Sequence, residues 1–158
     1  MIYLELKHLK PKRIKLLLLI LLFVMTSLVS QAQDHVVSLG AAMTGRGNPS
    51  GVIDAGIINR RNTIYKIEYC RNFGSNTDGT LAYPRNTFNL GMGQKTRTTF
   101  FTVYLGVCDK LYSNNLEKRK ISPNIAFDFG TIFKRNLFLS LYISLNNGVG
   151  LKTGMYFR

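Results

Sequence analysis

Five charged residues fall within segments that are otherwise apolar or rich in small residues, and they are the first candidates for chemistry. They are Asp54, Lys66, Glu68, Asp128 and Lys152. Three carboxylates could bind a divalent cation, because hard cations take oxygen ligands. Buried carboxylates more often pair with lysine or arginine, since an unpaired buried charge is costly. We therefore expect ion pairs at these positions, with no metal and no other cofactor.

The sequence shows no nucleophile placed beside a base. After the first 32 residues the only histidine is His35, and no serine lies in a Gly-x-Ser-x-Gly motif. A lone histidine near the start of a chain is more often solvated or interfacial than catalytic. Gly45-Arg46-Gly47 resembles half of a phosphate-binding loop, but no helical pattern follows it. We expect no enzymatic activity and assign no catalytic residue.

Residues 1–32 have the pattern of a secretory signal peptide. Basic residues precede the apolar run Leu16–Met25, and Ser30-Gln31-Ala32 offers small residues for cleavage. Even extended to Val29 the run covers 14 residues, fewer than the roughly 20 that a membrane-spanning helix needs. We expect cleavage after Ala32, not a retained anchor, and one domain over residues 33–158. That domain has 16 basic and 7 acidic residues, a net charge of +9, and export argues against a nucleic-acid partner.

The rest of the chain contains eight segments in which apolar residues alternate with small or polar ones. A period of two is typical of β-strands, and the expected strands are 35–44, 52–59, 63–71, 86–93, 98–108, 121–132, 137–145 and 149–158. Short connections follow the second, fourth and sixth strands, and longer ones, including 109–120, follow the first, third and fifth. Pro84 interrupts the fourth strand, since proline cannot donate to a sheet ladder. The last two strands meet at the hairpin signal Asn146-Asn147-Gly148. The predicted fold class is all-β.

The two faces of these strands differ in composition. In the seventh strand one face is wholly aliphatic, with Leu137, Leu139, Leu141, Ile143 and Leu145. The opposite faces hold mostly Ser, Gly, Asn, Ala and Tyr with isolated charges, whereas a solvated sheet gathers Lys, Glu and Thr. Small and tyrosyl side chains suit the narrow inside of an eight-stranded barrel. We therefore predict an eight-stranded antiparallel transmembrane β-barrel whose aliphatic face meets lipid and whose interior is filled by side chains.

Cys70 and Cys108 lie on the inward faces of the third and fifth expected strands, near the same rim. An exported chain permits a disulfide. The fourth strand lies between them, and two strand spacings put their Cα atoms roughly 9–10 Å apart, whereas a bridge usually needs less than about 7 Å. A disulfide therefore requires the rim to pinch inward. The alternative is two free thiols that behave as small apolar groups.

The chain after the signal resembles the small eight-stranded outer-membrane barrels of the OmpA/OmpX transmembrane type. Its last strand, Val149–Arg158, is similar to the C-terminal assembly signal of that family, although Arg158 follows the aromatic Phe157. The resemblance implies an outer-membrane location, periplasmic termini, and contact with membrane lipid and the outer-membrane assembly machinery. A second, shorter likeness is to TraO-type conjugal-transfer proteins, in Ile67-Glu68-Tyr69, Thr99-Phe100-Phe101 and Gly148–Lys152.

The expected loop 109–120 contains the basic residues Lys110, Lys118, Arg119 and Lys120. They form either a solvated loop tip or a contact for the phosphates of lipopolysaccharide through charge attraction. The sequence thus predicts a structural or surface-interaction role for a small outer-membrane barrel. Two alternatives stay open: a soluble periplasmic lipocalin-like barrel that binds an apolar ligand, and a component of a conjugal-transfer system. Specific partner and oligomeric state stay open as well.

Overall fold

The computed structural model describes residues 32–45, 47–74, 82–112, 115–133 and 136–157. Over these ranges the chain forms eight strands: β1 (Ala32–Met43), β2 (Pro49–Asn59), β3 (Thr63–Asn72), β4 (Ala82–Lys95), β5 (Thr99–Tyr112), β6 (Asn115–Ile132), β7 (Leu137–Ser144) and β8 (Gly148–Phe157). No helix in the described ranges is long and apolar enough to cross a membrane. The predicted signal peptide, except Ala32, lies outside the described residues.

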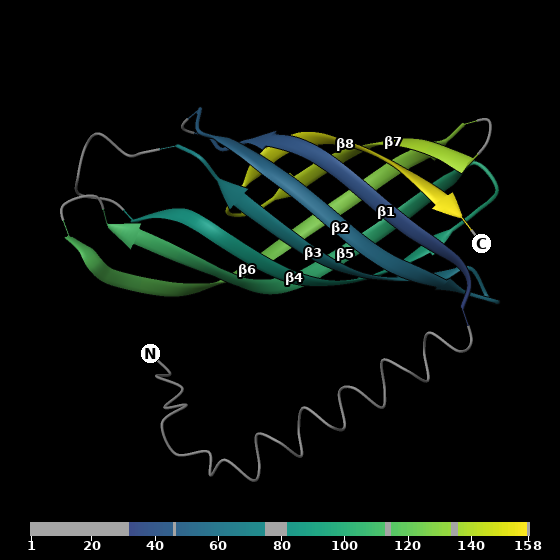
Figure 1. The fold of residues 1–158 in the computed structure, drawn as a ribbon, viewed down its shortest axis with the longest axis horizontal. Helices are drawn as coiled ribbons and strands as arrows, with labels where there is room; N and C mark the ends of the chain where they lie inside the picture. Colours follow the sequence, from purple (N-terminus) through teal and green to yellow (C-terminus); the bar gives the residue numbers. More distant parts are fainter. Residues whose placement is uncertain (1–31, 46, 75–81, 113–114, 134–135, 158) are drawn as a thin grey trace, which may run out of the picture.

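The eight strands form one closed antiparallel barrel, as the alternation predicted (Figure 1). Each strand pairs with its neighbours in sequence, and β8 closes the barrel against β1. The strands are staggered around the barrel. If one starts at His35 and steps from each residue to its paired partner on the next strand, one returns to β1 at Met43, eight residues after His35. A closed sheet with such a stagger has strongly tilted strands, at roughly 35–45° to the axis. Closure also pairs the sheet edges that would otherwise be exposed.

The two ends of the barrel differ. Ala32 and Phe157 lie at one end, together with the three short turns that join β2 to β3, β4 to β5 and β6 to β7 (Figure 1). We call this the terminal end and the opposite one the loop end. At the loop end Gly148 begins β8 with a φ of 77°, a left-handed conformation that glycine adopts without strain. The predicted hairpin at Asn146-Asn147-Gly148 is therefore confirmed.

Four strands, β2, β4, β5 and β6, extend at least three residues further at the loop end than the sequence indicated. β4 begins at Ala82 and passes through Pro84, because the ladder shifts between Pro84 and Asn86 and this irregularity accommodates the missing amide. β5 and β6 continue as a hairpin in which Lys110 pairs with Lys120. The prediction of a loop over 109–120 was wrong, because backbone pairing propagates from the barrel without an alternating pattern. β7 pairs with β6 only from Ala126 to Ile132, so this hairpin projects beyond the barrel wall (Figure 1).

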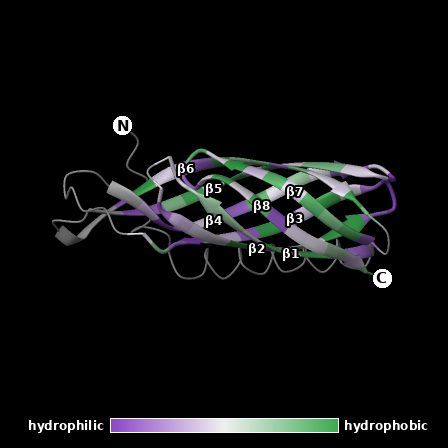
Figure 2. Ribbon diagram, turned by 90° about the horizontal axis from the view of Figure 1, so that it is seen from above, coloured by the Kyte–Doolittle hydropathy of each residue, from purple (hydrophilic) through white to green (hydrophobic). Residues whose placement is uncertain are grey.

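The predicted orientation of the strand faces is confirmed. Hydrophobic and hydrophilic residues alternate along the strands (Figure 2), and the apolar set points outward. Leu39 is 64% exposed and Leu141 44% exposed, whereas Tyr104 and Tyr142 are completely buried. Because the pleat sends successive side chains to opposite faces, the register of β-pairing places every polar side chain of the inward set in one narrow interior.

Candidate functional site

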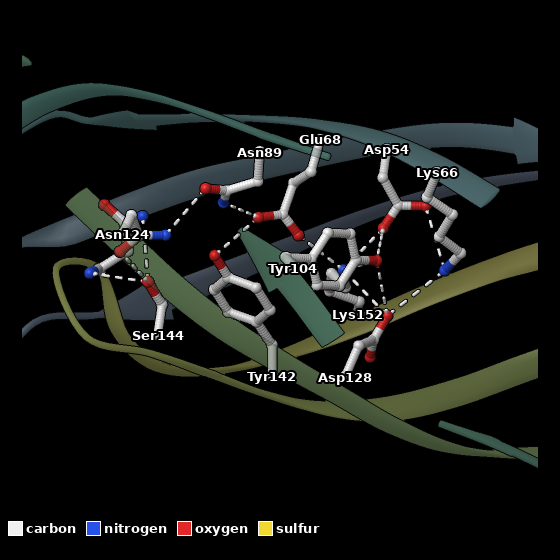
Figure 3. A network of polar contacts seen from close by, with 11 residues as sticks. Asp54, Lys66, Glu68, Asn89, Tyr104, Asn124, Asp128, Tyr142, Ser144 and Lys152 are labelled. Carbon is white, nitrogen blue, oxygen red and sulfur yellow. Dashed lines mark hydrogen bonds and ion pairs between the residues drawn. The ribbon is translucent and has the colours of Figure 1, made fainter. Parts of the chain in front are cut away.

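The centre of the barrel interior holds the five charged residues singled out in the sequence. The ammonium of Lys152, from β8, lies 2.6 Å from Asp54, 3.0 Å from Glu68 and 3.0 Å from Asp128. All four side chains are fully buried. The three carboxylates come from β2, β3 and β6 and converge on one amine (Figure 3). A single lysine therefore joins strands from opposite sides of the barrel.

Lys66 completes what we call the ionic cluster: Asp54, Lys66, Glu68, Asp128 and Lys152. Its ammonium lies 3.3 Å from Asp54 and 3.4 Å from Asp128, and both partners are fully buried. The predicted ion pairing is therefore confirmed. Among the described residues no group of three or more His, Cys, Asp or Glu side chains is arranged to hold a metal ion. With three carboxylates and two ammonium groups, the cluster has a formal charge of −1.

Neutral donors add hydrogen bonds to the carboxylates of Glu68 and Asp54. The Tyr142 hydroxyl donates to Glu68 at 2.9 Å, and the Asn89 amide donates to the same oxygen at 2.7 Å. The Tyr104 hydroxyl donates toward Asp54 at 3.3 Å. Asn89 also accepts from Asn124 at 3.0 Å, which extends the network toward the loop end (Figure 3).

Sequence reasoning did not assign these tyrosine and asparagine side chains to the network. Their signal was their position: each is a large polar residue on an inward face, and buried polar groups are almost always hydrogen-bonded. Which partner each one takes depends on the stagger between strands that are distant in sequence. Tyr142 and Glu68, for example, are separated by 74 residues.

An apolar plug closes the interior between the ionic cluster and the terminal end. It consists of Val36, Ile58, Ile64, Phe100, Phe138 and Tyr156. The Phe100 and Phe138 rings pack edge to face with centroids 4.9 Å apart, a favourable aromatic geometry. The Lys66 ammonium lies 5.1 Å from the Phe100 ring centroid, so a cation–π contact joins plug and cluster. Side chains thus fill the barrel at both levels.

Gly130 shows how tightly this plug is packed. A Cβ atom added at Gly130 would lie 2.4 Å from the Phe100 ring and 2.7 Å from the Ser140 side chain. Only a residue without a side chain leaves room for the aromatic ring at this position.

Cys70 and Cys108 are both free and buried, so the disulfide considered from the sequence is not formed. Each cysteine pairs with the same residue of β4, Thr87. The intervening strand therefore keeps the two thiols two strand spacings apart, and the rim does not pinch inward. The two cysteines pack as the sequence alternative described, as small buried groups.

The basic residues of the predicted loop lie on the β5–β6 hairpin. Lys110 and Lys120 are paired across it, and Arg119 pairs with Leu111. Lys120 is exposed and Lys110 is partly exposed, whereas the side chains of Lys118 and Arg119 lie outside the described set. The backbone register brings these positions together beyond the rim.

His35 lies at the terminal end of β1, far from the hairpin. Its ring stacks on Phe157 with centroids 5.6 Å apart, which fits the interfacial position expected for it.

The closed antiparallel eight-stranded β-barrel with a filled polar interior defines the structural class of this protein. No protein-family model and no curated protein matches the chain. Among solved structures, a barrel from the de novo design of transmembrane β-barrels matches with a TM-score of 0.50 and 14% identity, over 80% of this chain and 95% of that one. The designed barrel TMB2.3 matches with a TM-score of 0.47 and 17% identity, over 79% and 93%. Neisserial surface protein A matches with a TM-score of 0.39 and 12% identity, over 78% and 94%.

At these identities the likeness concerns the fold alone. The match with a TM-score of 0.50 supports a small eight-stranded barrel, and nothing in the comparisons supports the OmpA/OmpX type or TraO-type proteins in particular.

Proposed function

We propose that this protein is a small outer-membrane β-barrel, exported through a cleaved signal peptide, with a structural or surface-interaction role. The observation that carries this proposal is the composition of the outward face. No Asp, Glu, Lys or Arg occurs at the outward positions of 37–43, 51–57, 65–69, 88–92, 101–107, 121–131, 137–145 or 149–157. A water-exposed barrel of this size would carry charges there.

The few polar side chains in this apolar band suit a lipid boundary. The Thr153 hydroxyl donates to the Phe138 carbonyl at 3.0 Å, so it needs no water. The height of the band comes close to that of a membrane barrel: the 8 residues of the shortest strand, β7, at about 3.4 Å each and a tilt of about 40°, rise roughly 20 Å. Outer-membrane barrels present an apolar band about 25 Å tall.

The soluble alternative requires the opposite distribution. A lipocalin-like barrel that binds an apolar ligand needs an apolar cavity and a wet exterior. Here the interior holds the ionic cluster and the exterior is apolar, so an apolar ligand would have to displace paired charges at a high desolvation cost. This contrast favours the membrane barrel.

Because the interior is filled by side chains, the ends of the barrel are the parts that can contact other molecules. The plug and the ionic cluster leave side chains where a channel would run, which supports a structural or interaction function over transport. The β5–β6 hairpin projects beyond the barrel wall (Figure 1), and Lys110, Lys118, Arg119 and Lys120 give it positive charge. Contact with lipopolysaccharide phosphates is the interaction we propose for it.

Fractionation of cells that express the tagged chain tests this proposal. We expect the protein in the outer-membrane fraction, extracted only by detergent, with a gel mobility that changes on heating. N-terminal sequencing should begin at Gln33, because the Ser30-Gln31-Ala32 site follows a short apolar run. Recovery in the soluble periplasmic fraction, or retention of residues 1–32, would contradict the proposal.

A further inference from the structure

The three short turns at the terminal end all carry basic residues, and the function proposed so far makes no use of them. Arg60 and Arg61 lie between β2 and β3, and Arg97 lies between β4 and β5. All three side chains are exposed, and we call them the terminal collar. The sequence adds Lys134 and Arg135 to the connection between β6 and β7. In the sequence, each of the three short connections thus contains at least one basic residue.

We propose that the terminal collar binds the phosphate groups of anionic phospholipids in the membrane leaflet that adjoins the terminal end. The inference rests on the proposed membrane location. Guanidinium groups match phosphate oxygens in charge and geometry. A basic residue next to an anionic leaflet contributes about 1 kcal/mol, or about fivefold in binding.

The collar arginines have no competing carboxylate within the described part of the chain. The described acid at this end, Asp34, lies 3.4 Å from the Lys95 ammonium. The remaining described acids belong to the ionic cluster or, as Asp109 and Glu117, to the loop end. The guanidinium groups are thus available to an external anion.

The turns that carry the collar are fixed by their own hydrogen bonds. The Asn59 side-chain oxygen accepts from the backbone N–H groups of Arg61 at 2.9 Å and Thr63 at 3.0 Å. The Gln94 amide donates to the Arg61 carbonyl at 3.0 Å, which ties this turn to β4. In the next turn the Thr96 hydroxyl accepts from the backbone N–H of Thr99 at 3.0 Å. A preordered turn loses little entropy on binding.

The depth of the collar favours a lipid over a polymer of the cell wall. Apolar surface continues to this rim, where Leu137 is 46% exposed and Phe157 43% exposed. The turns are short, so their side chains lie in the headgroup layer, which is only about 5–8 Å thick on each side of the hydrocarbon core. At the loop end, in contrast, Lys110 and Lys120 lie on a hairpin that projects past the rim.

Native mass spectrometry of the folded full-length mature chain tests the inference. The protein is equilibrated in nonionic detergent with equal amounts of phosphatidylglycerol and phosphatidylcholine, and the bound lipids are counted. We expect the wild type to retain phosphatidylglycerol preferentially. The variant Arg60→Gln/Arg61→Gln/Arg97→Gln should lower that preference by well over the roughly fivefold that one basic residue contributes. Arg97→Gln alone should lower it by a smaller factor.

The matched control, compared with Arg60→Gln/Arg61→Gln, removes two charges from the other end by Arg71→Gln/Arg85→Gln, two exposed basic residues outside the proposed lipopolysaccharide contact. It should keep the preference within about twofold, less than the loss of a single leaflet contact. Three results would overturn the inference. The preference for phosphatidylglycerol could fall equally in the collar and control variants, it could stay unchanged in the collar variants, or the wild type could show no such preference. Sedimentation with purified cell-wall sacculi that depends on the collar, with the lipid preference unchanged, would overturn it in favour of a cell-wall partner. Failure of the wild type to show heat-modifiable mobility in lipid would instead count against the membrane location.

Discussion

Replacing Lys152 with methionine isolates the contribution of charge inside the barrel. Methionine is unbranched and nearly as long as lysine, so little packing is lost. The substitution removes an ammonium that lies 2.6 Å from Asp54 and 3.0 Å from both Glu68 and Asp128. Lys66 then remains near Asp54 and Asp128, and Glu68 keeps only the neutral donors Asn89 and Tyr142.

The expected loss of unfolding free energy is about 3–5 kcal/mol, the usual result of removing one partner of a buried ion pair. The loss is this large because the carboxylates left behind are fully buried and cannot be rehydrated without opening the barrel. Unfolding free energies of small domains are about 5–15 kcal/mol, so the variant should lose a large fraction of its stability.

Urea titration of the chain folded in short-chain phosphatidylcholine vesicles measures this, with the folded fraction read from the gel mobility of unheated samples. Lys120→Met removes an exposed charge and should change stability by less than about 0.5 kcal/mol. Adding Glu68→Gln to Lys152→Met restores the formal cluster charge of the wild type. The unfolding free energy of the double variant should therefore be at least about 1 kcal/mol higher than the sum of the two single effects predicts. If Lys152→Met has the same unfolding free energy as the wild type, the ionic cluster does not stabilise the barrel as we argue. The same follows if the effects of Lys152→Met and Glu68→Gln are simply additive.

Three further predictions concern the two faces of the wall and the thiols. Leu141→Arg, at an outward position, should lower the unfolding free energy by roughly 2–4 kcal/mol in the same titration. Ser140→Ala should change it very little, because the buried Ser140 hydroxyl has no hydrogen-bond partner. The reverse ranking would favour a water-exposed exterior. Gly130→Ala should cost about 1–3 kcal/mol by overpacking, because its Cβ would lie 2.4 Å from the Phe100 ring, while Gly45→Ala, with open space around it, should be neutral. Thiol counting on denatured, unreduced protein should find two free thiols per chain, and a count of zero would show a bridge that the register does not allow.

The sequence alone determined the strands and their faces. Alternation with a period of two is a local property, so Leu137 to Leu145 could be assigned to one face without knowing their neighbours. The contrast between aliphatic and small polar faces then indicated a barrel whose inside is polar. The same reasoning placed Asp54, Lys66, Glu68, Asp128 and Lys152 inside, where the cost of an unpaired charge required them to pair.

Only the tertiary structure decided which of these groups meet. Lys152 contacts Asp54 across 98 residues of chain, and that contact depends on the stagger of all eight strands, because a shift of one residue in any ladder would send a different side chain inward. The extension of β5 and β6 was missed for a related reason. Residues 109–120 have no alternation to reveal a strand, and their pairing follows from the ladder that the barrel had already begun. Faces are encoded locally, whereas contacts across the barrel are set by the closure of the whole sheet.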